Sequence, residues 1–196
     1  MEAEKAHEIA KDASLEQLAA MALHTSARVL SDQSRYAESI ERFRAVASLY
    51  AAADEGYEGL RVRINIGICY VALGKTREGI RQLRDALDEA RDAGHRRLES
   101  FAWSALGEAF FRSDEPRRAR HCFRESDALA VYNDEKQTDI LFFNAFYEWK
   151  MATVESNPTR EKMAFGRMKA LRSNLERKFP EVDEFDEYVE GGRSHG

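Results

Sequence analysis

The sequence predicts an all-α fold, a right-handed solenoid of about four antiparallel helix pairs with partial helices at both ends. Two observations support this prediction. Small and large apolar residues recur at a spacing of 40 residues, and short polar connectors fall between the recurring segments. Long alternating runs of β-branched residues, which are typical of strands, do not occur in the sequence. We therefore expect helices throughout the chain.

The recurrence places small residues on both helices of each expected pair. They are Ala27, Gly67 and Gly107 on the first helix and, twelve residues later, Ser39, Gly79 and Ala119 on the second. Large apolar residues accompany them at Leu30, Tyr70 and Phe110 and at Phe43, Leu83 and Phe123. Glycine inside a helix costs about 1 kcal/mol relative to alanine, so the helical glycines need a packing reason. We expect the small residues to bring two helices together and each large residue to fill the adjacent groove.

Three repeats follow one another along the chain. They span residues 14–53, 54–94 and 95–132, with connectors inside the pairs at 32–35, 74–76 and 113–116. Ser14 and Gln17 form a capping box, which predicts a helix start at Ser14, and Thr76 and Asp114 are expected N-caps. Residues 1–13 are then the end of a preceding repeat or an N-terminal capping helix. We expect the chain to be a piece of a longer protein.

The C-terminal part departs from the 40-residue phase. Residues 133–179 are expected to form a divergent fourth helix pair, whose first helix is rich in aromatic residues. Terminal units of a helical stack are usually atypical because one of their faces meets solvent. We expect residues 180–190 to form an acidic capping helix over this pair and residues 191–196 to form a disordered tail.

Composition and charge narrow the range of functions. A hydrophobic content of 43% is too high for a disordered chain. The sequence contains no apolar run long enough to span a membrane and begins without the features of a secretory signal, so we expect a cytoplasmic protein. The net charge of −5 lies in residues 181–196, where six carboxylates face Arg193 alone, and the remainder of the chain is balanced. Neither direct nucleic-acid binding nor a membrane partner is expected.

Catalytic motifs are not evident in the sequence. The five histidines are scattered, and the glycines stand singly rather than in a phosphate-binding loop. Cys69 and Cys122 fall on helix faces that point toward neighbouring helices, where cysteine behaves as a small hydrophobic residue. We therefore expect a protein that is not an enzyme and carries no catalytic residues, metal site or cofactor.

The third repeat carries a recognisable motif. It contains Trp103-x2-Leu106-Gly107-x2-Phe110 followed by Ala119-x3-Phe123. This pattern resembles the tetratricopeptide repeat family, whose motif runs W-x2-L-G-x2-Y and then A-x3-F. The resemblance covers residues 15–131 firmly and residues 134–179 loosely. A period of 40 residues resembles the long-helix subtype of the family rather than its common form of about 34 residues.

The resemblance implies a concave binding groove formed by the first helix of each pair. Counting along these helices places the following side chains in the groove: His24, Arg28, Arg61, Ile64, Asn65, Ile68, Phe101, Ser104, Glu108, Phe111 and Arg112. Ile68 and Phe111 have no packing role in this arrangement. The groove is therefore expected to combine apolar and basic character.

The predicted function is non-catalytic binding of a protein or peptide partner within a larger signalling or regulatory protein. The alternative is a ligand- or peptide-sensing domain of a bacterial transcriptional regulator, which a DNA-binding helix-turn-helix upstream of residue 1 would favour. We expect Ile9, Leu15 and Leu18 to be apolar positions of the N-terminal edge that lack a covering helix. We expect any self-association to use this edge rather than the acidic C-terminal one.

Overall fold

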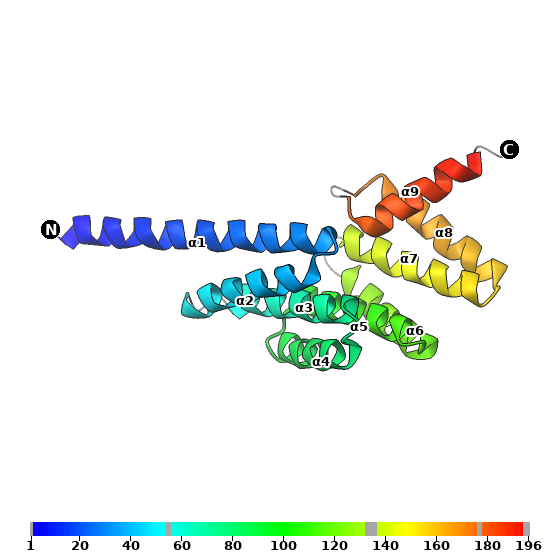
Figure 1. Cartoon of the computed structure of the whole chain (residues 1–196), viewed down its shortest axis with the longest axis horizontal. Coiled ribbons are helices and arrows are strands. Elements are labelled where there is room, and N and C mark those ends of the chain that lie inside the picture. Colours follow the sequence, from blue (N-terminus) through cyan, green and yellow to red (C-terminus); the bar gives the residue numbers. More distant parts are fainter. Residues whose placement is uncertain (1, 54–55, 132–136, 176–177, 194–196) are drawn as a thin grey trace. The chain divides into compact units, whose positions relative to one another are not determined.

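The computed structural model describes residues 2–53, 56–131, 137–175 and 178–193, and this part of the chain contains helices but no strands (Figure 1). The helices are α1 (Glu2–Asp32), α2 (Tyr36–Ala52), α3 (Gly56–Ala72), α4 (Thr76–Asp92), α5 (Arg96–Arg112), α6 (Pro116–Ala130), α7 (Thr138–Val154), α8 (Pro158–Arg172) and α9 (Pro180–Arg193). The all-α prediction is confirmed. The chain divides into two compact units, Met1–Gln82 and Leu83–Gly196, with the boundary inside α4.

The helix starts reproduce the period seen in the sequence. The second helices α2, α4 and α6 begin at Tyr36, Thr76 and Pro116, each 40 residues after the previous one. The first helices α3 and α5 begin at Gly56 and Arg96 with the same spacing. Helices α7 and α8 begin 42 residues after α5 and α6, so the fourth pair is out of phase by two residues.

Each within-pair turn is closed by one residue in the left-handed region. These residues are Ser34, Gly74, Asp114 and Ser156, with φ angles of 60°, 78°, 56° and 53°. The next N–H donates to the carbonyl five residues back, as from Lys75 to Tyr70 at 2.9 Å and from Glu115 to Phe110 at 2.9 Å. This is the Schellman ending of a helix. The expectation that Asp114 caps α6 is therefore wrong, and Thr76 is already the first residue of α4.

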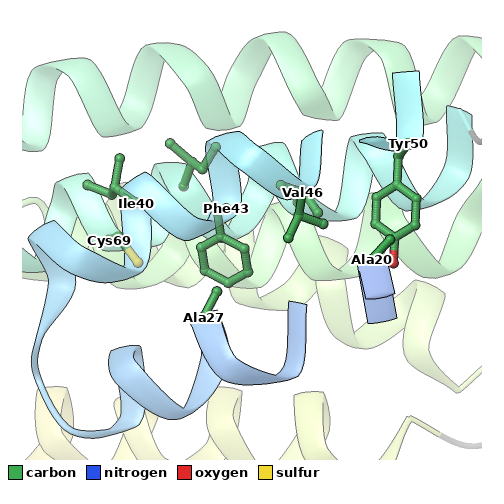
Figure 2. Packing of buried hydrophobic residues seen from close by; sticks show 9 residues of the cluster. Ala20, Ala27, Ile40, Phe43, Val46, Tyr50 and Cys69 are labelled. Atoms are coloured by element: carbon green, nitrogen blue, oxygen red, sulfur yellow. The ribbon is translucent and has the colours of Figure 1, made fainter. Parts of the chain in front are cut away.

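In the first unit, α2 packs between α1 and α3 around a buried apolar cluster. Phe43 and Val46 of α2 are almost wholly enclosed, and Figure 2 shows them together with Ala20 and Ala27 of α1. Cys69 of α3 completes the same cluster, and its buried sulfur lies 3.6 Å from the Ser39 hydroxyl oxygen. The small residues of α1 allow the large side chains of α2 to sit against its backbone.

The predicted contacts between small residues are found in this unit. The carbonyl of Ala27 accepts a hydrogen bond of 2.7 Å from the Ser39 hydroxyl. A Cβ added to Gly79 would lie 2.8 Å from the carbonyl oxygen of Gly67, closer than real Cβ atoms approach backbone. Only a glycine fits there, which supplies the packing reason for its position inside α4.

In the second unit, the corresponding glycine meets a ring. A Cβ on Gly107 of α5 would overlap the aromatic ring of Phe123 of α6, and Phe123 is fully buried. Ala119, one turn earlier on α6, is also fully buried. In the third pair, Gly107 therefore leaves the space that the ring of Phe123 fills.

Helix α9 covers the fourth pair through aromatic contacts. Phe185 of α9 lies edge to face against Phe142 of α7, with 5.6 Å between ring centroids. Phe179, just before α9, meets the same ring at 5.9 Å. Val182 is fully buried in this arrangement. The exposed acidic residues of α9 are Asp183, Glu184, Glu187 and Glu190.

Two expectations about the ends are wrong. Helix α1 continues through Ser14 without a break, because residues 2–13 contain good helix formers and neither glycine nor proline. The side chains of residues 2–14, including Ile9, lie outside the described part, and the assignment of residues 1–13 to an earlier repeat stays a prediction. Helix α9 runs to Arg193, so residues 191–193 do not belong to a disordered tail; residues 194–196 lie outside the described residues.

Candidate partner-binding surface

Three of the predicted groove residues of the first unit come together around His24. The imidazole of His24, on α1, is 3% exposed. An η nitrogen of Arg61 lies 3.1 Å from Nδ1, and the side-chain amide of Asn65 lies 3.4 Å from Nε2. Both partners stand on α3, four residues apart, and therefore on one face of that helix.

The protonation state of His24 follows from its surroundings. Burial, followed by the charges of Arg61 and Arg28, lowers the pKa of His24 to about 4. The ring is therefore neutral at pH 7. Arginine can only donate, so Nδ1 accepts from Arg61 and Nε2 carries the hydrogen. The atom of Asn65 nearest Nε2 is Nδ2, so Asn65 accepts this hydrogen only when its amide is turned to bring Oδ1 to the ring, and its NH2 group then points away from His24.

The remaining residues of this patch differ in accessibility. Arg28 is exposed, and Arg61, Asn65 and Ile68 are half-buried. Ile64 is fully buried, so its predicted place in an open groove is wrong. Arg61 also forms an ion pair with Glu58 one turn earlier on α3. We name Arg28, Arg61, Asn65 and Ile68 the His24 patch, since His24 holds two of them in place.

In the second unit, α7 covers part of the predicted surface of α5. Ser104 is 3% exposed and donates a hydrogen bond of 2.6 Å to Oδ1 of Asn144 on α7. Glu108 is 6% exposed and accepts from Nε of Arg112 at 2.8 Å. Their predicted exposure in a groove is therefore wrong. Helix α7 packs against α5 within this unit, so the side of α5 that faces α7 is closed.

Phe101, Phe111 and Arg112 remain accessible at the surface of α5. Phe101 and Phe111 are half-buried, and Arg112 is exposed. The ring of Phe111 lies edge to face against Tyr147 of α7, with 5.3 Å between centroids. Arg112 keeps its charge, because Glu108 and Tyr147 raise its pKa against the effect of burial. This part of the surface is apolar with a cation beside it.

Sequence reasoning missed a buried polar network centred on Asn144. Its side chain is fully buried, and its Nδ2 donates to the Ser126 hydroxyl at 3.0 Å and to Asp127 at 2.8 Å. Arg167 of α8 donates to the same Asp127 at 2.6 Å. The signal in the sequence was a lone asparagine within the aromatic run of α7. A buried amide needs partners, and this one has them on α5 and α6.

A second missed cluster joins α9 to α7. The Tyr147 hydroxyl donates to Oε1 of Glu181 at 3.5 Å. Burial, with a further contribution from the charge of Glu108, raises the pKa of Glu181 to about 7. Burial likewise raises the pKa of the Tyr147 hydroxyl well above its ordinary value. The sequence predicted an acidic capping helix here, but the spacing of its acidic residues does not show which carboxylate is turned inward.

Within the residues that the structure describes, no group of three or more histidine, cysteine, aspartate or glutamate side chains is placed to hold a metal ion. None of the described helices is long and apolar enough to cross a membrane.

Successive antiparallel helix pairs with a 40-residue period define a helical-repeat protein. Residues 17–92 match the model of the tetratricopeptide repeat family. This match covers less than half of the chain and, together with the consecutive helix pairs, supports a tetratricopeptide-type repeat architecture. Repeats of this family are generally non-catalytic modules for protein–protein interaction. No curated protein matches the chain.

Proposed function

We propose that this chain binds a peptide or protein partner through the exposed side chains of its first helices, and that the His24 patch is a principal contact. The observation that carries the proposal is the neutral, buried His24 beneath Arg61 and Asn65. The neutral imidazole holds the side chains of Arg61 and Asn65 in position and carries no charge that would itself attract an anion. The patch is therefore rich in donors and suits a carboxylate of the partner.

The apolar part of the contact comes from different residues. Ile68 lies on α3, three residues after Asn65, and is half-buried. The second unit has a candidate surface of its own, in which Phe111 and Arg112 provide an aromatic ring and a cation and Phe101 lies at the other end of α5. Aromatic and arginine side chains frequently dominate the energy of protein interfaces. We propose that the module serves within a larger signalling or regulatory protein.

A peptide selection tests this proposal. Peptides selected from a random display library against the full chain would be measured by titration calorimetry on the wild type and on Arg61→Gln. The matched control is Arg77→Gln, an exposed arginine of α4 in the same unit. We expect Arg61→Gln to weaken the binding of the selected peptides by about tenfold or more, because the peptide carboxylate loses the guanidinium that His24 holds in position. Arg77→Gln should leave the affinity unchanged.

The contrary result is equally clear. Peptides that bind Arg28→Gln, Arg61→Gln and Asn65→Ala as tightly as the wild type would overturn the His24 patch as the contact. Circular dichroism of each variant establishes that its helices are intact, so a loss of affinity is not a loss of folding.

A further inference from the structure

A concave site also exists in the second unit, formed by residues other than those of the proposed contact surface. It lies between α4 and α6, with α5 beneath, and encloses a volume of about 320 Å³. Its floor is apolar and consists of Leu87, Leu106, Phe110 and Cys122, all of them buried. Trp103 of α5 lines the same site. We call this site the Arg84 pocket.

Arginine side chains surround the pocket. Arg84 and Arg91 come from α4 and Arg118 comes from α6, against a single carboxylate in the lining, Asp88. The guanidinium of Arg118 lies 3.8 Å from the centroid of the Phe110 ring, and that of Arg84 lies 5.9 Å from the same ring. Stacking on an aromatic face holds a guanidinium in place without using its hydrogen-bond donors.

The arginines differ in whether a carboxylate already pairs with them. Arg118 forms an ion pair of 2.6 Å with Glu115, and Arg91 one of 3.2 Å with Glu99. For Arg84, the described part of the chain offers a ring contact with Phe110 and no carboxylate within ion-pair distance. Its donors therefore remain available at the mouth of an apolar cavity.

We infer that the Arg84 pocket binds an acidic peptide segment of a protein partner, with one apolar side chain on the floor and the adjacent carboxylate on Arg84. Arg84 argues for the carboxylate, because Arg118 pairs with Glu115 and Arg91 pairs with Glu99 and Asp88, whereas Arg84 has no such partner among the described residues. The volume argues for a single side chain, since it lies at the lower end of the range for ligand pockets. The carboxylate of Asp88 repels a peptide carboxylate, so the acidic residue of the peptide should lie on the side of the pocket away from Asp88.

Cys122 does not alter this charge balance. Burial raises the pKa of the Cys122 thiol to about 11, against the opposing charges of Arg118 and Arg84. The thiol is therefore neutral at pH 7 and forms part of the apolar floor. His121 stands at the rim with its ring edge to face against Trp103, at 5.7 Å between centroids.

Trp103 provides the readout for a binding test. The chain holds two tryptophans, so the fluorescence of the full chain carrying Trp149→Phe reports on the pocket alone. The probes are synthetic hexapeptides with glutamate or aspartate on both sides of leucine, isoleucine, methionine or phenylalanine. The matched array replaces each carboxylate by its amide. We expect members of the acidic array to change the fluorescence and their amide counterparts to bind at least tenfold more weakly.

Variants of two arginines assign the binding to the pocket. Arg84→Gln should lower the affinity for the acidic peptides at least tenfold, and Arg84→Glu should abolish their binding. Arg124→Gln changes an exposed arginine of α6 outside the pocket and should have no effect. Because Arg84 is exposed, these substitutions leave the apolar floor intact. Cys122→Met, which fills the floor, should also exclude the peptides.

The outcomes separate this inference from the proposed function. Peptides lost from Arg84→Gln but retained by Arg61→Gln support the pocket. Peptides lost from Arg61→Gln but retained by Arg84→Gln overturn the pocket and favour the His24 patch. Failure of every acidic peptide, or equal binding of the amide array, also overturns the inference. A fluorescence response to inorganic phosphate alone would likewise show an anion site rather than a peptide site.

Discussion

The hydroxyl of Ser39 donates a hydrogen bond of 2.7 Å to the carbonyl oxygen of Ala27, across the contact between α2 and α1. The two residues occupy the same repeat positions as Gly79 and Gly67, where the helices approach too closely for a Cβ. The first pair therefore accepts a small polar side chain where the second requires glycine. Ser39 is fully buried, and its bond to a carbonyl satisfies its hydroxyl.

Gly79→Ala should destabilise the protein although alanine is the better helix former. The new methyl group would lie 2.6 Å from Cγ2 of Val71 and 2.8 Å from the Gly67 carbonyl oxygen. Overpacking of this kind costs about 1–3 kcal/mol. Urea denaturation measures the loss. Gly166→Ala on α8 is the control, because its Cβ would meet nothing within 4 Å and should be neutral or stabilising. Similar midpoints for both variants would contradict the close approach.

Asp114→Gly should stabilise the protein by about 0.5–1 kcal/mol. Asp114 has a φ of 56°, a conformation that costs a residue with a Cβ about 1–2 kcal/mol, and glycine recovers part of this. Thermal unfolding would show the gain. Gly74→Ala is the reciprocal variant at a φ of 78°, with open space around its Cβ, and it should lose stability by a comparable amount. A stable Gly74→Ala would mean that the turn relaxes easily.

Stability should fall as the pH drops below about 6.5 because of His24. The folded protein takes up this proton near pH 4, whereas the unfolded chain takes it up near the ordinary value of 6.5. As the pH falls, His24 is therefore protonated first in the unfolded state, and the free energy of unfolding decreases by at most about 3 kcal/mol. Urea midpoints at pH 7 and pH 5 measure it. His24→Gln removes the titration and should reduce the difference; an unchanged pH dependence would exclude His24 as its source.

Glu181 should produce the opposite trend. Its folded-state pKa of about 7 lies above the ordinary value of 4.5, so the stability it contributes is complete below pH 4.5 and is lost as the pH rises through 7. Glu181→Gln should therefore raise the urea midpoint at pH 8 and leave it little changed at pH 4. Glu187→Gln, on the exposed side of α9, is the matched control. Equal effects of the two variants at pH 8 would contradict the burial of Glu181 beside Tyr147.

The repeat pattern predicted the helices and their phase because it records packing between neighbours. Gly67, Gly79 and Phe123 could be assigned to helix contacts from their spacing alone. The turns were harder to predict from the sequence, because aspartate is favoured both as an N-cap and in the left-handed region. Asp114 adopts the left-handed conformation. Ser14 shows the same limit, because a capping box does not interrupt a segment without a helix breaker.

The predicted binding surface was identified less completely than the fold. Periodicity shows which residues share a face of a helix but not which neighbouring helix covers that face. Ser104 was expected to be open and is instead bonded to Asn144. The Arg84 pocket was not predicted, because its residues come from three helices and their convergence depends on the packing of α4 beside α6.

The recurrence of one turn geometry makes the chain suitable for modular engineering. Gly74 and Asp114 close successive pairs with the same left-handed conformation and the same hydrogen-bond pattern. A segment cut after each of them, residues 75–114, therefore begins and ends at equivalent joints. Duplicating it would keep every later helix in register, whereas inserting a single residue within α5 would rotate the rest of that helix by about 100°. The length of the array could thus be changed in whole cassettes, with only the new contact between α5 and the duplicated α4 left to redesign.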